Sequence, residues 1–182
     1  MFLPTRKLFA LLPIAAALIG VQPLAAQQHP QQHEHPAVAP AAPAAQGTET
    51  QRVARAIEAV FAAAERGDLA ALDTLYAGDS LTVLEGAGIN RGWPNYRDTH
   101  LAPELKEFKN FRYRPFDIEV RVSGDMAWAM FRYALSADMG ERKIDSIGRG
   151  TMILERRGAK WVVRHSHTAS RARRAGDPPM PS

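Results

Sequence analysis

Apolar residues in the first half of the chain recur with the period of an α-helix. Between Thr48 and Gly67 they form one stripe, at Val53, Ile57, Val60, Phe61 and Ala64. That spacing predicts an amphipathic helix, which Gly67 ends. Asp68 is then well placed to cap a second, shorter helix, whose apolar residues are Leu69, Leu72, Leu75 and Tyr76. A third helix is predicted from Trp93 to Phe108, with a kink or a break at Pro103.

The second half of the chain is typical of β-structure. A short strand at 80–85 precedes a glycine-rich turn at 86–92, and four long segments rich in β-branched and aromatic residues follow at 111–122, 126–138, 142–157 and 160–171. Their short connections favour antiparallel hairpins. Helices followed by strands indicate an α+β domain in which a curved antiparallel sheet packs against helices.

The strand at 126–138 carries apolar residues on both faces. Ala127, Ala129 and Phe131 alternate with Trp128 and Met130, so both faces are expected to be covered. Helices would cover one face. For the other we expect a second subunit, and hence a homodimer, or the chain's own ends.

Composition sets the domain boundaries. Residues 1–26 have a short basic start, an apolar run and small residues at Ala25 and Ala26, the layout of a secretory signal peptide. We therefore expect an exported protein, periplasmic or secreted, that meets the membrane only through this peptide before cleavage. Residues 27–47 predict a disordered His/Pro/Ala-rich linker, 48–171 the folded domain and 172–182 a disordered tail.

Several functional classes are disfavoured by composition. The chain has no cysteine, which excludes disulfides and thiolate metal sites. Its net charge of +4 comes with no interleaving of lysines and aromatics, so nucleic acid is not an expected partner. His29, His33 and His35 in the linker form a tract that either binds copper or zinc loosely or is incidental.

These segments together resemble the nuclear transport factor 2-like superfamily, and more narrowly its SnoaL-like and ketosteroid-isomerase-like members. The most specific parts are the junction AAAERGDLAALDTLYAGD and the final strand WVVRHSHTASR. The resemblance implies a cone-shaped roll with about three N-terminal helices around a mostly apolar cavity. It also implies small-molecule binding, with isomerases, dehydratases, polyketide cyclases, hydrolases and non-catalytic assembly modules among its members.

Candidate cavity residues follow from this fold. On the third helix they are Trp93, Tyr96, His100 and Glu104, which share one side if the helix keeps its phase past Pro103. Strict alternation puts His165 and His167 of the last strand on the face of Trp161 and Val163. Arg149 and Glu119 come from other strands, and the glycines at 148 and 150 can introduce a bulge that shifts the phase. The known isomerases use a buried aspartate, but alternation alone places none of Asp117, Asp138 and Asp145 in the cavity.

Three chemistries stay open for these residues. The first is acid/base catalysis on a small apolar or aromatic molecule without an organic cofactor, with His167, His165 or His100 moving the proton. Tyr96 or Arg149 would then stabilise an oxyanion. The second is a metal site for zinc, copper, iron or manganese built from His100, Glu104, His165 and His167. In the third, the strand histidines only bond carboxylates such as Glu119 at the rim of the cavity.

Overall fold

The computed structural model describes residues 43–182 of the chain. The predicted signal peptide, the histidine tract and most of the predicted linker lie outside the described residues. The first helix, α1 (Pro43–Glu65), begins within the last part of the predicted linker. Among the described helices, none is long and apolar enough to cross a membrane.

The first two helices match the prediction from periodicity. The stripe of α1 is buried, with Val53 and Ile57 fully inaccessible and Phe61 at 1% exposure. Helix α2 (Leu69–Leu75) begins after Asp68, whose Oδ1 accepts a hydrogen bond from the backbone N–H of Ala71 at 2.9 Å. Burial of the two apolar faces fixes both helices against the sheet, because apolar area removed from water is the main stabilising term.

The third helical segment contains an unusual turn. Helix α3 (Trp93–Tyr96) continues into a five-residue π-helical turn, η2 (Arg97–Leu101), and then into α4 (Ala102–Glu107). Pro103 has no N–H to donate to the preceding turn, and a widened turn accommodates such an interruption without ending the helix. The predicted kink or break is therefore a π-helical turn just before Pro103.

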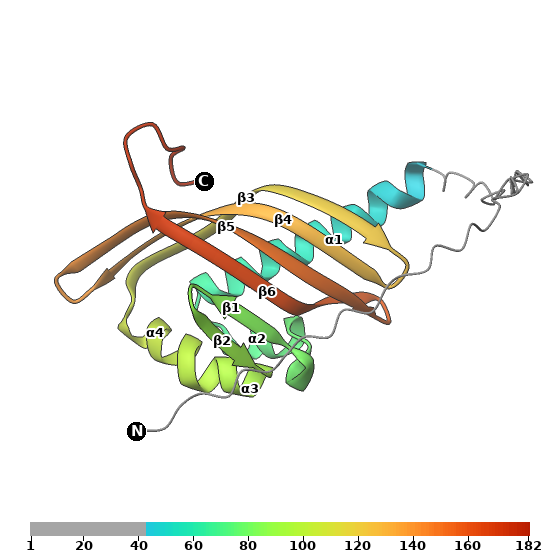
Figure 1. Ribbon diagram of the computed structural model, residues 1–182, viewed down its shortest axis with the longest axis horizontal. Coiled ribbons are helices and arrows are strands. Elements are labelled where there is room, and N and C mark those ends of the chain that lie inside the picture. The colour runs from blue at the N-terminus through green and yellow to red at the C-terminus, as the bar shows by residue number, and fades with distance from the viewer. Residues whose placement is uncertain (1–42) are drawn as a thin grey trace, which may run out of the picture. The chain divides into compact units, whose positions relative to one another are not determined.

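A six-stranded curved sheet forms the rest of the fold (Figure 1). Its strands are β1 (Thr82–Glu85), β2 (Gly88–Arg91), β3 (Lys109–Ser123), β4 (Met126–Met139), β5 (Arg142–Arg157) and β6 (Lys160–Ala172). The order is β2-β1-β6-β5-β4-β3, antiparallel except for the parallel pair β1–β6. Figure 1 shows the helices on the concave side of this sheet, which confirms the predicted α+β, cone-shaped roll.

Strand β3 bends where its register with β4 shifts. The two shifts coincide with Asn110 and Asp117, which have positive φ angles of 52° and 51°, a conformation that Asn and Asp adopt more readily than other non-glycine residues. Between these bends, Glu65 at the end of α1 accepts a hydrogen bond from the backbone N–H of Tyr113 at 2.8 Å and pairs with Arg114 at 2.9 Å. The bent strand thereby wraps around α1.

The sheet has two unlike faces. The inner face, toward the helices, carries the buried residues Ala127, Ala129 and Phe131 of β4 and belongs to the hydrophobic core. The outer face exposes large apolar side chains: Trp128 and Met130 are each 45% accessible. The apolar character of β4 on both faces is therefore as predicted, but the described chain leaves much of the outer face in contact with solvent.

A bulge in β6 changes which side chains share a face. Leu154 pairs with Val163, whereas the adjacent Ile153 pairs with His165, so Arg164 is an extra residue in β6. The alternation is reset at that point. The prediction that His165 and His167 lie on the face of Val163 is therefore wrong: both histidines point to the outer face.

The glycines of β5 introduce no such shift. Pairing between β4 and β5 is continuous from Met126 to Met139, through Gly148 and Gly150. Their role is steric, because a Cβ atom at Gly148 would lie 2.2 Å from Cζ of Tyr133. The missing side chain lets the Tyr133 ring lie against the backbone of β5 and leaves Arg149 on the outer face.

Beyond β6, the segment for which composition predicts a disordered tail makes specific contacts. The Arg173 guanidinium donates to Asp145 of β5 at 2.8 Å, and Asp177 pairs with Arg171. These contacts direct the tail back over the sheet near the start of β5.

Candidate functional site

The concave side of the sheet and the α3–α4 segment enclose a cavity of about 420 Å³. One part of its wall is apolar, formed by Leu101, Leu105, Phe108, Phe111, Leu135 and Ile144. The polar lining residues are Glu85, Tyr96, His100, Glu104, Tyr113, Tyr133, Ser146, Thr168 and Ser170. A cavity with an apolar body and a few convergent polar groups is the usual form of a small-molecule site.

His100 lies at the centre of the polar wall. It belongs to the π-helical turn, and its Nε2 atom is 2.8 Å from Oε2 of Glu85 and 3.4 Å from Oε1 of Glu104. Its other ring nitrogen, Nδ1, is 3.2 Å from Oδ1 of Asn90 in β2. The imidazole is therefore held from both edges, by two carboxylates on one and an amide on the other.

The hydrogen bonds of Asn90 define the protonation of this ring. Its Nδ2 atom donates to Oδ1 of Asn95 at 3.0 Å, which leaves its own Oδ1 as the acceptor that faces His100. Nδ1 of His100 therefore carries a proton. Nε2 is thereby left to face Oε2 of Glu85, at a hydrogen-bond distance of 2.8 Å.

Glu85 owes its position to the pairing of β1 with β6. The parallel register sets Glu85 opposite Thr168, whose hydroxyl donates to Oε1 of Glu85 at 3.4 Å. The hydroxyl of Tyr96 donates to the same oxygen at 3.3 Å. One carboxylate oxygen of Glu85 is thus held by hydroxyls, and the other faces His100.

Burial alters the titration of the groups around His100. It raises the pKa of Glu104, and the charge of Glu85 adds to that rise while His100 opposes it. Burial also raises the pKa values of the Tyr96 and Tyr113 hydroxyls well above the ordinary value. Both tyrosines therefore remain protonated at neutral pH. The Tyr96 hydroxyl donates to Glu85, whereas that of Tyr113 is available to donate a hydrogen bond into the cavity.

Comparisons with known proteins agree with this fold. A family model described as the SnoaL-like domain matches residues 53–171. The chain belongs to the SnoaL-like family. The match covers the second half of α1, all of α2, the cavity residues and the four long strands up to Arg171, so the family recognised from the sequence is confirmed. No protein from a curated set of sequences matches the chain.

Solved structures similar to this SnoaL-like protein share its fold at low sequence identity. A candidate dehydratase of the nuclear transport factor 2-like family from Streptomyces avermitilis has a TM-score of 0.62 at 19% identity, covering 68% of this chain and 96% of that one. A candidate ketosteroid isomerase from Shewanella frigidimarina has a TM-score of 0.56 at 20% identity, covering 63% and 91%. A nuclear transport factor 2-like protein from Salmonella enterica has a TM-score of 0.63 at 16% identity, covering 73% and 99%. Identities this low establish the fold alone.

The structure brings three of the predicted site residues together in the cavity. Tyr96, His100 and Glu104 all line it, although a π-helical turn lies within the segment that presents them. Trp93 is placed differently. Its ring stacks on Tyr76 with the centroids 4.7 Å apart, its Nε1 donates to Asp73 at 2.5 Å, and it is buried in the core beside the cavity.

The other predicted residues gather on the opposite side of the sheet. His167, Arg149 and Glu119 line a hollow of about 730 Å³ on the outer face, and His165 lies on that face as well. The predicted metal site is therefore not formed, because His100 and Glu104 lie on one side of the sheet and His165 and His167 on the other. Within residues 43–182, no group of three or more histidine, cysteine or acidic side chains is arranged to hold a metal ion.

Sequence reasoning missed the carboxylate closest to His100. Glu85 ends a short strand before a glycine turn, and nothing in its local pattern marks it as a cavity residue. Only the non-local pairing of β1 with β6 brings it to the cavity. Asp117, Asp138 and Asp145, considered as counterparts of the family's aspartate, bond instead to Arg132, Asn110 and Arg173 and do not line the cavity.

Proposed function

We propose that this protein is a small-molecule enzyme of the isomerase or lyase type, which uses His100 and Glu85 to move a proton within the cavity. The observation that carries the proposal is the 2.8 Å contact between Nε2 of His100 and Oε2 of Glu85 at the wall of a largely apolar cavity. A histidine whose far nitrogen is fixed by a hydrogen bond has the orientation that acid/base catalysis requires.

The proposed reaction needs no organic cofactor. Nε2 of His100, or the Glu85 oxygen bonded to it, accepts a proton from carbon next to a carbonyl or a leaving group. The electron pair left behind moves toward that carbonyl oxygen or expels the leaving group. The protonated hydroxyl of Tyr113, which lines the cavity, is the donor that would stabilise the developing oxyanion. The same proton is then returned to another position of the product or to the leaving group.

The lining also limits the substrate. It includes no lysine or arginine, and His100, which lines it as well, already faces two carboxylates. An anionic group would therefore meet two acidic side chains without a free cation to balance it. The apolar wall suits a ring or a short hydrocarbon body. We accordingly expect an uncharged, mostly apolar or aromatic molecule with one oxygen function.

Proton abstraction can be tested before the natural substrate is known. 2-Tetralone, an enolisable bicyclic ketone, serves as the probe, and its hydrogen–deuterium exchange in D₂O is followed by proton NMR. The wild-type protein is expected to exchange the protons next to the carbonyl faster than buffer does. His100→Ala should lower the enzymatic rate by about 10²–10⁴-fold, the range typical of a lost general base.

Two further variants make this test selective. Glu85→Gln keeps the shape of the side chain but removes the charge that faces His100, and it should also slow the exchange. His165→Ala is the matched control, because this histidine lies on the outer face, and it should exchange at the wild-type rate. If 2-tetralone binds in the cavity but the wild-type protein exchanges no faster than buffer, the catalytic proposal fails and a binding module is left.

We also propose that the protein is exported after cleavage near Ala26. The support is the layout of residues 1–26, in which Arg6 and Lys7 precede an uninterrupted apolar run. Expression of the full chain in a bacterial host followed by mass spectrometry of the periplasmic fraction tests this. A mature chain that starts near residue 27 is expected, and an uncleaved chain retained with the cells would contradict it.

The exposed apolar residues of the outer face support a second proposal, that the protein is a homodimer. Trp128 and Met130 are each 45% accessible, and Ile153 on the adjacent strand is 36% accessible. A contiguous apolar patch of this kind favours a protein interface. Trp128→Glu is expected to convert the dimer into monomers in sedimentation velocity, whereas Arg142→Glu at the distant β4–β5 turn should leave it dimeric. Monomeric wild-type protein would contradict the proposal.

A further inference from the structure

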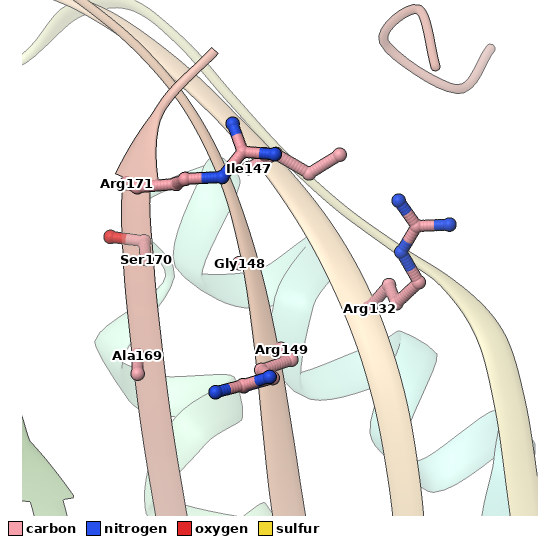
Figure 2. A pocket seen from close by; sticks show the side chains of 7 residues that line it. All are labelled: Arg132, Ile147, Gly148, Arg149, Ala169, Ser170 and Arg171. Atoms are coloured by element: carbon pink, nitrogen blue, oxygen red, sulfur yellow. The ribbon is translucent and has the colours of Figure 1, made fainter. Parts of the chain in front are cut away.

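Three arginines gather on the outer face, on the side of the sheet opposite to the cavity residues. Arg132, Arg149 and Arg171 line a hollow of about 370 Å³ together with Ile147, Gly148, Ala169 and Ser170. Figure 2 shows their side chains rising from three neighbouring strands, β4, β5 and β6. The hollow adjoins the larger one that contains His167, because Arg132, Arg149 and Ala169 line both.

The arrangement is unfavourable for the sheet alone. Arg132 and Arg149 are direct cross-strand partners, and like charges placed opposite each other destabilise a strand pair. Arg132 is compensated by Asp117, 3.3 Å away. Arg149 has no hydrogen bond and no ion pair with any described residue, and it is exposed. A free guanidinium beside another one is a group prepared for an anion.

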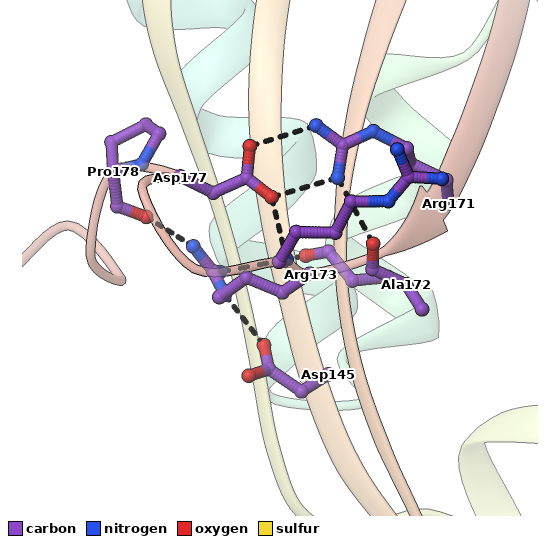
Figure 3. Close-up of polar contacts among 8 residues, drawn as sticks. Asp145, Arg171, Ala172, Arg173, Asp177 and Pro178 are labelled. Carbon is purple, nitrogen blue, oxygen red and sulfur yellow. Dashed lines mark hydrogen bonds and ion pairs between the residues drawn. The ribbon is translucent and has the colours of Figure 1, made fainter.

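The third arginine already holds a carboxylate. Nη1 and Nη2 of Arg171 each donate to one oxygen of Asp177, both at 2.7 Å, and the backbone N–H of Arg174 donates to the same carboxylate at 2.7 Å (Figure 3). This is the two-pronged geometry with which arginine binds carboxylate and phosphate groups. These hydrogen bonds hold the pKa of Asp177 well below its ordinary value.

Asp177 belongs to the short tail after β6, which is secured at few points. Besides Asp177, the tail is held by Arg173, whose guanidinium contacts the side chain of Asp145 and the carbonyls of Ser146 and Pro178, and whose backbone N–H donates to the carbonyl of Asp145. Arg174, Ala175 and Gly176 are exposed. An anion that competes for Arg171 would therefore displace a side chain on a short surface segment and leave the hydrophobic core intact.

We propose that Arg132, Arg149 and Arg171 form a binding groove for a small oxyanion, in which Asp177 of the tail occupies the Arg171 end until an external anion replaces it. The ligand class is a phosphate or carboxylate compound that spans neighbouring arginines. The groove shares Ala169 and Ser170 with the lining of the cavity, but it offers arginine side chains where the cavity offers acidic ones. The proposal goes beyond the acid/base function and does not depend on it.

The test measures anion affinity by isothermal titration calorimetry on the full chain at low ionic strength and neutral pH. Inorganic pyrophosphate is the phosphate probe, and malonate is the carboxylate probe. Arg149→Gln is expected to weaken binding of the preferred probe by about tenfold, the effect of losing a charged hydrogen-bond partner. Arg142→Gln is the control, since it removes the same charge from an exposed position on the same strand, and it should change affinity less than twofold.

A second variant addresses the tail. Asp177→Asn removes the competing charge without shortening the chain, and it should tighten binding several-fold, because the external anion no longer displaces a carboxylate. Weaker or unchanged binding in this variant would overturn the role of Asp177. Equal losses in Arg149→Gln and Arg142→Gln would show an adventitious ion only, drawn by general positive charge.

The groove and a subunit interface are distinguished by hydrodynamics. Two results together would overturn the proposal: Arg149→Gln changes the sedimentation coefficient without any added anion, and the wild type and Arg149→Gln bind pyrophosphate and malonate equally well. The groove would then be a contact with a second copy of the chain. An unchanged sedimentation coefficient together with the selective loss of affinity supports the oxyanion groove.

Discussion

The same residue type meets opposite surroundings on the two faces of the sheet. On the inner side, His100 is bonded at both ring nitrogens and adjoins an apolar cavity. On the outer side, His165 and His167 make no hydrogen bond to any described residue. An imidazole oriented by partners at both ring nitrogens is suited to catalysis, whereas an unrestrained one at the surface is not. The two regions therefore differ in the number of hydrogen-bond partners that hold each imidazole, and not in whether a histidine is present.

The largest expected difference between the faces concerns stability. Phe61 packs from α1 onto the inner face with 1% exposure, and its ring lies 5.4 Å from that of Phe131. Phe61→Ala should lower the free energy of unfolding by about 3–5 kcal/mol, because it leaves a cavity in the core. Urea denaturation followed by circular dichroism measures this loss.

Trp128→Ala is the matched aromatic truncation on the outer face. Because nearly half of this side chain is already exposed, the same measurement at concentrations where the chain is monomeric should give a loss of about 1 kcal/mol or less. A loss as large as that of Phe61→Ala would mean that the outer face belongs to the core of the single chain.

Most of the fold follows from local sequence pattern. The stripe of Val53, Ile57 and Phe61 predicts α1, and the composition and turns of residues 111–171 predict the four long strands, because burial on one face imposes period 3.6 on helices and period 2 on strands. These signals depend on neighbours within a few positions, and so they can be read without a structure.

Only part of the candidate site could be predicted from the sequence, because the rest depends on pairing between distant strands. Tyr96, His100 and Glu104 lie on one continuous helical segment, and helical spacing found them. Glu85 and Thr168 reach the cavity through pairing between strands more than 80 positions apart. The faces of His165 and His167 depend on an extra residue at Arg164, and a bulge of that kind leaves no mark in the alternation of the strand that contains it.

A smaller effect is expected from filling the space beside Tyr133. Gly148→Ala places a methyl group where the Tyr133 ring now lies, so the ring must move and the cavity wall with it. Overpacking of this kind costs about 1–3 kcal/mol. Thr151→Ala, three positions along the same strand, is the comparison on the outer-face side and should cost less. Equal losses in the urea midpoint would show that the close approach of Tyr133 is not restrictive.

The smallest expected effects are on how the free energy of unfolding depends on pH, and they have opposite signs on the two faces. Burial raises the pKa of Glu104 on the cavity side. The folded chain then retains this proton at pH values where the unfolded chain, with a pKa of about 4.3, has lost it. The contribution of Glu104 to the free energy of unfolding therefore falls as the pH rises from about 4.3 through the raised pKa. Compared with Glu104→Gln, the wild-type urea midpoint should decline over that range.

His165 on the outer face should act in the other direction. Partial burial, and secondarily His167, lowers its pKa, so the unfolded chain, with a pKa of about 6.5, binds the proton more readily than the folded chain does. Its contribution to the free energy of unfolding rises as the pH increases from the lowered pKa to about 6.5. The wild-type midpoint should accordingly rise relative to His165→Gln over that interval. Parallel slopes for the Glu104 and His165 pairs would contradict the assigned directions.

The π-helical turn at Arg97–Leu101 gives this site a simple point of change. Such a turn holds one residue more than an α-helical turn, and each residue of an α-helix advances by about 100° around the axis. Deleting one residue between Arg97 and Thr99 would therefore convert the segment to a regular helix and rotate the residues before the deletion relative to His100 and Glu104. Tyr96 would then stand three rather than four positions before this histidine, and its direction relative to Glu85 would change. The relative orientation of Tyr96 and the acid/base pair thus depends on the presence of a single residue in this turn.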